Sequence, residues 1–165
     1  MPVDTERTIE MTEYIIQIGN KPIDKDDYIE ESGYYDSWLL GSVADYVSDV
    51  PEEDYDEIIE AIGSRTGIET VKTEDGWKIR IKDIKSYFSE KYRTFMAKCE
   101  EMKDLTLEQF ASYEFGYEAY SMYKFANDKY DLYLDRDGLI NIDGFLREAK
   151  DGDEYYIGGI VSYHC

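Results

Sequence analysis

The apolar residues of this chain follow two periodicities, and each periodicity predicts one kind of element. Short segments rich in Ile, Val and Tyr, bounded by Gly, Asn, Asp or Pro, predict strands. They lie at residues 13–18, 68–72, 77–81, 130–134, 139–142 and 155–163. The turns at 74–76 and 135–138 both end in Asp-Gly, so they predict two antiparallel hairpins.

Helical spacing predicts a short acidic helix after Pro51. Three acidic residues follow this proline, as is typical of a first helical turn, and Gly63 is the expected end. Four apolar residues recur at i, i+3, i+4 and i+7 and predict a buried stripe: Tyr55, Ile58, Ile59 and Ile62. The preceding segment 37–47 is apolar nearly all round, which predicts a helix buried against the acidic one.

Two longer helices are predicted in the second half of the chain. Asp83 is placed to cap a helix that reaches about Lys103, and Thr106-x-x-Gln109 fits a capping box that opens another helix to about Asn127. No internal repeat or Pro/Ser-rich linker interrupts the pattern. We therefore expect residues 12–165 to form a single α+β domain with a mostly antiparallel sheet, two long helices and a shorter acidic helix, after a flexible tail at 1–11.

Charge narrows the possible partners. The chain has 38 acidic and 18 basic residues, a net charge of −20; residues 1–63 contain 18 acids and 3 bases, and residues 64–105 contain 8 acids and 10 bases. This balance disfavours binding to duplex DNA or anionic membranes and favours a basic partner. The 17 tyrosines favour a folded chain over a disordered one. The basic segment 72–98 has two interpretations, internal charge balance or contact with nucleic acid held by the partner.

One face of the acidic helix carries only carboxylates. They are Glu53, Asp56, Glu57 and Glu60. At 1.5 Å per residue they span about 10.5 Å, or about one charge per 3.5 Å, and one DNA strand carries about one charge per 3.4 Å. We interpret this face as an imitation of a phosphate backbone; an ordinary solvated helix face is the alternative.

Residues that carry chemistry are few. The single histidine, His164, adjoins the last residue, and Cys99 and Cys165 form no paired metal motif. No phosphate-binding glycine loop occurs either. We therefore expect neither enzymatic activity nor a cofactor.

Residues 133–145 resemble an EF-hand or dockerin calcium loop, with Asp135 and Asp137 at ligand positions. Tyr133 and Gly144 stand where two principal ligands belong, so an Asp-rich hairpin turn is the favoured interpretation and a calcium site the alternative.

The sequence gives no sign of export. Residues 1–14 lack the basic and apolar regions of a signal peptide, and the apolar run at 155–161 is too short to span a bilayer. We expect a cytoplasmic protein.

Acidic stripes, abundant tyrosine and the lack of a catalytic constellation resemble the nucleic-acid-mimic inhibitors that phages and mobile elements use against host nucleases. The run FGYEAYSMY at 115–123 is similar to the aromatic-acidic runs of ArdA-type antirestriction proteins, and an anti-CRISPR protein fits equally well. The resemblance implies a non-enzymatic inhibitor that occupies the basic groove of a restriction enzyme or CRISPR effector.

Thirteen carboxylates and three tyrosines are the expected contacts with that groove. They are Asp24, Asp26, Asp27, Glu30, Glu31, Asp45, Asp49, Glu52, Glu53, Asp54, Asp56, Glu57, Glu60, Tyr28, Tyr34 and Tyr35. The alternative is a structural or adaptor protein in which the Tyr-rich segment 107–125 forms an oligomer interface, for example in a homodimer.

Overall fold

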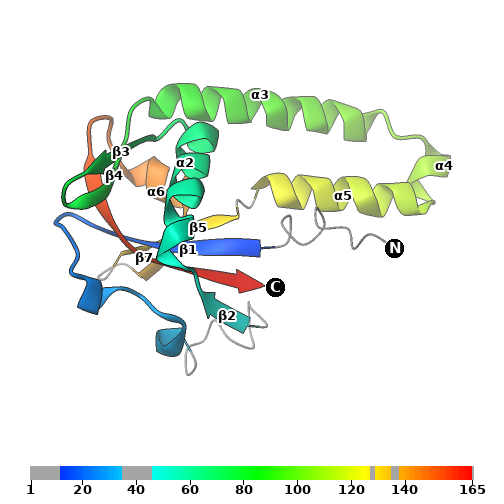
Figure 1. The fold of residues 1–165 in the computed structure, drawn as a ribbon. Helices are drawn as coiled ribbons and strands as arrows, with labels where there is room; N and C mark the ends of the chain where they lie inside the picture. Colours follow the sequence, from blue (N-terminus) through cyan, green and yellow to red (C-terminus); the bar gives the residue numbers. More distant parts are fainter. Residues whose placement is uncertain (1–11, 35–45, 127–128, 135–137, 165) are drawn as a thin grey trace.

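A seven-stranded sheet forms the centre of the computed structural model, which describes residues 12–34, 46–126, 129–134 and 138–164 (Figure 1). The strands are β1 (Thr12–Gly19), β2 (Tyr46–Asp49), β3 (Glu69–Thr73), β4 (Gly76–Arg80), β5 (Tyr130–Leu134), β6 (Gly138–Asn141) and β7 (Glu154–His164). Their order is β3-β4-β7-β1-β5-β6, and β2 also pairs with β7. All pairs are antiparallel except β1 with β5, so the predicted fold class is confirmed.

Strand β7 organises the sheet because its 11 residues pair along both edges. One edge pairs with β1, while the other pairs with β4 near its start and with β2 near its end. The apolar run predicted as a closing strand is therefore a central strand, which explains why it is nearly continuously buried.

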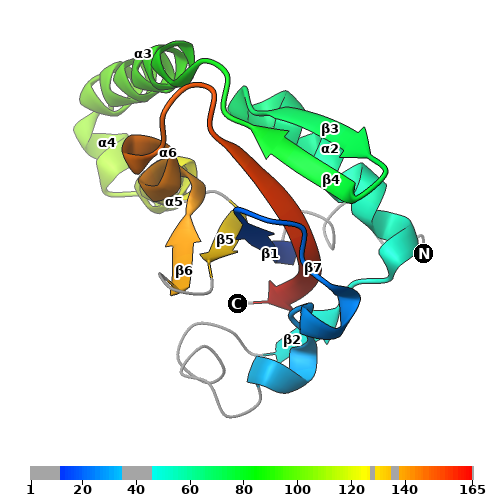
Figure 2. The same cartoon turned by 90° about the vertical axis from the view of Figure 1, so that its left-hand side faces the viewer.

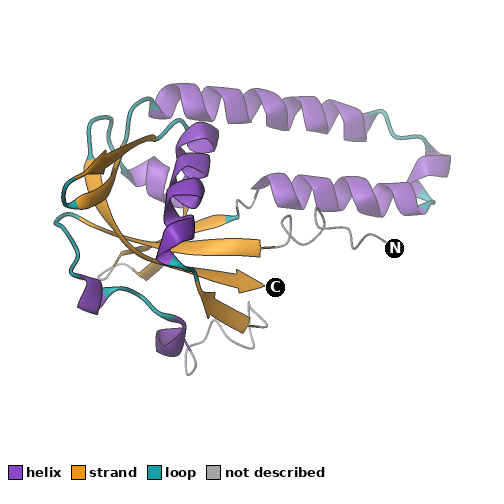
Figure 3. Cartoon of the chain, viewed as in Figure 1, coloured by secondary structure: helices purple, strands orange, loops and turns teal. Residues whose placement is uncertain are grey.

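The helices, purple in Figure 3, include three short 3-10 turns. These turns are η1 (Lys25–Asp27), η2 (Glu31–Tyr34) and η3 (Glu52–Asp54). The α-helices are α2 (Tyr55–Thr66), α3 (Ile84–Lys103), α4 (Leu107–Phe110), α5 (Tyr113–Ala126) and α6 (Ile142–Glu148). In Figure 1, α3 and α5 run side by side beyond the end of the sheet, with α4 at the far tip.

Both faces of the sheet are covered. Successive residues of a strand point to opposite faces, so Ile16 and Ile15 belong to different clusters. The larger cluster joins the sheet to the stripe of α2 and to α6, whose Phe145 and Leu146 are buried. The smaller cluster lies between the sheet and residues 28–34, which Figure 2 shows below the sheet.

The acidic helix has the predicted buried stripe but a different end. Ile58, Ile59 and Ile62 are at most 8% exposed, whereas the helix continues past Gly63 to Thr66 and is capped by Gly67 in a left-handed conformation. Gly63 is a packing position, because a Cβ there would lie 3.0 Å from Thr70 Oγ1.

Two other helix predictions were wrong in part. Of the predicted helix 37–47, residues 37–45 lie outside the described residues, and Tyr46 and Val47 belong to β2, where an open edge of β7 offers them hydrogen bonds. The capping box at Thr106 is confirmed, yet the helix it opens ends at Phe110, and the break lets the rings of Phe110 and Phe115 pack with centroids 4.5 Å apart.

Helix α6 was missed by the sequence analysis. Ile142, predicted as the last residue of a strand, is instead the first residue of α6, because the Asn141 side chain accepts a hydrogen bond from the Gly144 amide and caps the helix.

Candidate functional site

The fold brings two acidic segments, residues 24–31 and 49–60, into direct contact. Lys25 Nζ lies 2.6 Å from Glu52 Oε2. The backbone amide of Glu31 donates to Asp49 Oδ1 at 2.7 Å, and the amide of Asp49 donates back to Glu31 Oε2 at 3.1 Å. Segments almost twenty residues apart in sequence thus form one surface, which we call the acidic surface and define as residues 24–31 and 49–60 of the structure.

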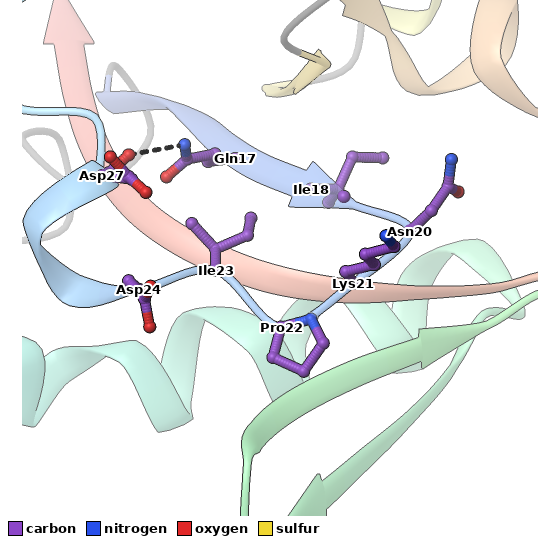
Figure 4. Close-up of a pocket in the computed structure, with 9 residues that line it drawn as sticks. Gln17, Ile18, Asn20, Lys21, Pro22, Ile23, Asp24 and Asp27 are labelled. Carbon is purple, nitrogen blue, oxygen red and sulfur yellow. Dashed lines mark hydrogen bonds between the residues drawn. The ribbon is translucent and has the colours of Figure 1, made fainter.

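The first segment is fixed to the sheet by Gln17, a buried residue of β1. Its Nε2 donates to the Asp27 carbonyl at 2.9 Å, and its Oε1 accepts from the amides of Ile29 and Gly159 at 3.1 and 2.9 Å. Figure 4 shows the Gln17 side chain reaching from β1 to Asp27. Gly159 is required here, because a Cβ would lie 2.7 Å from the Ile29 carbonyl oxygen. The position of the acidic surface is therefore set by the sheet.

The second segment is fixed by α2. Helix α2 is held against the sheet by its buried isoleucines and by Tyr55, whose hydroxyl accepts a hydrogen bond from the Ile160 amide of β7 at 3.0 Å. Burial raises the pKa of Tyr55, and the neighbouring carboxylates of Glu52 and Asp49 raise it further. The inner face of α2 is thus anchored, which leaves Glu57 and Glu60 exposed on this helix and Glu53 exposed in the preceding turn η3.

Asp56 differs from the other carboxylates of α2 because it has two partners in the β3–β4 hairpin. Lys72 Nζ and Trp77 Nε1 each donate to it at 2.6 Å. The hydrogen bonds from Lys72 and then Trp77 lower its pKa. Asp56 therefore links the acidic surface to the hairpin, and its charge is partly balanced within the chain.

A groove of about 420 Å³ runs between α2 and the paired strands β1 and β5. Its lining includes Asp54 and Glu57 on one side and Lys129 on the other. Tyr14 and Tyr130, directly opposite in the parallel β1–β5 pair, stack with ring centroids 5.8 Å apart in its wall. Burial raises the pKa of Tyr14, and the carboxylates of Glu57 and Asp54 raise it further.

A second hollow, about 750 Å³, lies between the end of β1 and residues 20–27 (Figure 4). Asp24 and Asp27 line it together with Lys21. Asp24 and Asp27 belong to the acidic surface, so the hollow adjoins that surface.

The carboxylates predicted as contacts are mostly exposed. Those exposed are Asp24, Asp26, Asp27, Glu30, Asp49, Glu52, Glu53, Asp54, Glu57 and Glu60, while Glu31 and Asp56 are half-buried. Asp45 and Tyr35 lie outside the described residues.

Tyr28 and Tyr34, two of the expected tyrosine contacts, are half-buried and therefore less accessible than the exposed carboxylates. Tyr34 packs against the smaller core cluster, and burial raises its pKa to about 12. Its ring therefore serves mainly to hold residues 28–34 against the sheet.

Most of the basic segment 72–98 has partners within the chain. Arg80 Nη2 lies 2.5 Å from Glu154, Lys82 lies 3.4 Å from Glu69, and Lys91 is paired with Asp143. Lys78 lies over the Tyr156 ring, 4.4 Å from its centroid, and Lys98 donates to Ser121 Oγ at 3.1 Å. These contacts favour the interpretation of internal charge balance.

The metal and calcium sites that the sequence raised fall only partly within the described part of the chain. No three His, Cys, Asp or Glu side chains group there in a way that would hold a metal ion. His164 is paired with Tyr46 across β2 and β7, and their rings stack 5.5 Å apart. Asp135 and Asp137 lie outside the described residues.

Among the helices that the structure describes, none combines the length and the apolar character needed to cross a bilayer.

In comparisons with known proteins, no family model matches this chain, and no curated protein or solved structure matches it significantly. The site is therefore interpreted from its own geometry and charge.

Proposed function

We propose that this protein is a non-enzymatic inhibitor that imitates a nucleic-acid backbone and binds the basic groove of a host-defence nuclease, either a CRISPR effector or a restriction enzyme. The observation that carries the proposal is the contact between the two acidic segments through Lys25–Glu52 and Glu31–Asp49. It merges carboxylates from η1, β2, η3 and α2 into one surface on a fixed scaffold.

The charge of this surface is suited to a groove that binds a polyanion. The two segments of the acidic surface, residues 24–31 and 49–60, contain 12 acids and a single base, Lys25. A row of carboxylates near the phosphate spacing presents basic groove residues with the same pattern of charge as a DNA strand. Lys and Arg side chains of the groove would pair with these carboxylates and release the counterions held by both surfaces.

Rigidity supports the proposal as much as charge does. Gln17 and Tyr55 hold the two acidic segments against β1 and β7 by hydrogen bonds to backbone groups. A preformed array of carboxylates loses less conformational entropy on binding than a disordered acidic tail.

The internal partners divide the carboxylates into two groups. Glu52 and Asp56 are each within 2.6 Å of a lysine of the chain itself, so a nuclease would have to displace or share those lysines. Glu53 of η3 and Glu57 and Glu60 of α2 are exposed and are the best placed for direct contact.

Charge reversal of these three residues tests the proposal. The variant Glu53→Lys/Glu57→Lys/Glu60→Lys should lose inhibition of target cleavage in a panel of purified CRISPR effectors and restriction enzymes. Its thermal unfolding should remain cooperative, because all three side chains are exposed. A matched control, Glu90→Lys/Glu101→Lys/Glu148→Lys, changes the net charge equally at exposed positions on α3 and α6 and should inhibit like the wild type.

Salt dependence provides an independent criterion. Association through ion pairs with a nuclease should weaken steeply as salt rises from about 0.05 M to about 0.5 M. Inhibition that is unchanged in the α2 triple variant, or that is lost equally in the control variant, would contradict a contact through α2. A panel in which the wild-type protein inhibits no nuclease would reject the function itself.

A further inference from the structure

The α4–α5 segment carries an unusual concentration of exposed aromatic side chains. Four tyrosines of α5 are exposed to 100%, 75%, 55% and 63%: Tyr113, Tyr117, Tyr120 and Tyr123. Leu107 and Phe110 of α4 are 82% and 55% exposed. Such a row on one short segment is uncommon on a monomer, and interfaces are enriched in tyrosine.

The tyrosines share one face of α5. Their spacing of three or four residues places them within about 120° of the helical wheel. A different side of α5 contacts α3, because Phe125 stacks on Phe95 with centroids 6.4 Å apart and Ser121 accepts a hydrogen bond from Lys98. We call the row Tyr113, Tyr117, Tyr120 and Tyr123 the tyrosine face; it points away from α3.

The size of the tyrosine face is close to that of a dimer interface. With about 200 Å² for a whole aromatic side chain, the four exposed fractions correspond to about 600 Å². A specific interface of standard size buries about 800 Å² on each partner. The tyrosines alone would supply most of this area, and Leu107 and Phe110 extend it.

Charge indicates which partner suits this face. Residues 84–126 contain six bases and seven acids, a net charge of −1, whereas the other residues contain 12 bases and 31 acids, a net charge of −19. Two copies of this acidic protein repel each other least when they meet through this nearly neutral part. A strongly basic partner, by contrast, would be attracted to the acidic surface.

The helix dipole of α5 also favours one orientation. When two copies of this helix run antiparallel, their dipoles are opposed, and the positive end of each helix lies beside the negative end of the other. The arrangement is self-complementary, as a twofold axis requires.

We propose that the protein forms a homodimer in which the tyrosine face of α5 packs antiparallel against the same face of a second copy. In Figure 1 the hairpin of α3 and α5 extends past the sheet, while η1 and η2 lie away from it. The dimer would therefore leave both acidic surfaces accessible.

Sedimentation equilibrium of the full-length protein tests this inference. Between about 1 and 100 µM, the wild type should approach twice the 19.3 kDa mass of one chain. The variant Tyr117→Ser/Tyr120→Ser should raise the dimer Kd at least about 30-fold, the change expected from loss of central interface residues. Its circular dichroism should match that of the wild type, because both side chains are more than half exposed.

A matched control separates this face from other tyrosines. Tyr46→Ser/Tyr92→Ser removes two tyrosines that are 55% and 64% exposed on β2 and α3, and it should dimerise like the wild type. A wild-type protein that is monomeric at about 100 µM, or a dimer that the Tyr117/Tyr120 variant retains, would overturn the inference. The first result would leave the tyrosine face to a different protein.

Salt distinguishes this inference from the proposed function. Dimerisation should persist or strengthen at about 0.5 M salt, because screening reduces the repulsion between two highly acidic chains. The α2 triple charge reversal should leave the dimer intact, so failure of nuclease inhibition and failure of dimerisation are separate results.

Discussion

The contact between Asp143 and Lys91 is expected to be a main determinant of how the helical hairpin is held against the sheet. Asp143 of α6 pairs with Lys91 of α3 and accepts a hydrogen bond from the Tyr87 hydroxyl at 2.6 Å. The side chains of Asp143 and Lys91 are only 10% and 18% exposed. Helix α3 has no fully buried residue, and its Ile84, Tyr87 and Phe88 are only partly buried where they pack against the core.

Replacing Asp143 by Ala should therefore destabilise the protein strongly. Removing one partner of a buried ion pair costs about 3–5 kcal/mol, since the other charge remains without compensation. Lys91 also lies near the rings of Tyr87 and Phe125, 5.8 and 5.6 Å from their centroids, and its long side chain can move toward solvent. We therefore expect a loss near the lower limit, about 3 kcal/mol, which corresponds to a decrease in Tm of about 9 °C.

Urea unfolding followed by circular dichroism measures this loss. The control is Glu100→Ala, because the Glu100–Lys103 pair is exposed and should contribute less than about 1 kcal/mol. In a double-mutant cycle, Asp143→Ala should cost much less when Lys91 is replaced by Met. A loss below about 1 kcal/mol in the single variant, or additive effects in the cycle, would refute the view that this pair anchors the hairpin.

Three further predictions concern close packing at Gly159, the pH dependence of stability, and repulsion within the acidic chain. Gly159→Ala should lower the free energy of unfolding by about 2 kcal/mol, because its Cβ would meet the Ile29 backbone, and it should reduce nuclease inhibition without altering a carboxylate. Gly33→Ala is the control: its Cβ would enter open space, so its stability in urea unfolding should be nearly unchanged. Folding lowers the pKa of Asp56 and of Glu154, so each carboxylate stabilises the protein above its unfolded pKa, and this stabilisation is lost as the pH falls through the folded pKa. The Tm should therefore fall below about pH 4, and Asp56→Asn should make that decrease smaller. Raising salt from about 0.01 to about 0.5 M at pH 7 should raise the Tm, and an unchanged or lower Tm would argue against self-repulsion as a major cost.

Local signals predicted much of the fold correctly. The strand after Met11, the hairpin around Asp75-Gly76 and the Asp83 cap are confirmed, because turn chemistry and capping depend on residues close in sequence. The Asn141 cap followed by Ile142, Phe145 and Leu146 was a signal of the same kind for α6 and was overlooked. A strand ending and a helix beginning at the same place share their apolar residues, so periodicity alone favoured the strand.

The contacts that assemble the acidic surface were less accessible to sequence analysis. Glu31 and Asp49 exchange hydrogen bonds between backbone amides and carboxylates, and these bonds depend on the pairing of β2 with the edge of β7. Strand β2 has only four residues, so its alternation of apolar and polar residues is too short to predict that pairing. The groove wall formed by Tyr14 and Tyr130 depends on a parallel pairing between strands far apart in sequence. Sequence therefore identified the carboxylates of α2, but only the tertiary register shows which residues lie beside them.

The internal ion pairs also bear on why so acidic a chain can fold. Lys72, Arg80 and Lys82 neutralise carboxylates of β3, α2 and β7 around the β3–β4 hairpin. Repulsion is thereby reduced where strands must pair, while the outer face of α2 keeps its exposed carboxylates. The exposed carboxylates then cost stability but serve binding. Replacing Glu53, Glu57 and Glu60 by Gln should therefore raise the Tm and abolish inhibition, so that stability and activity change in opposite directions.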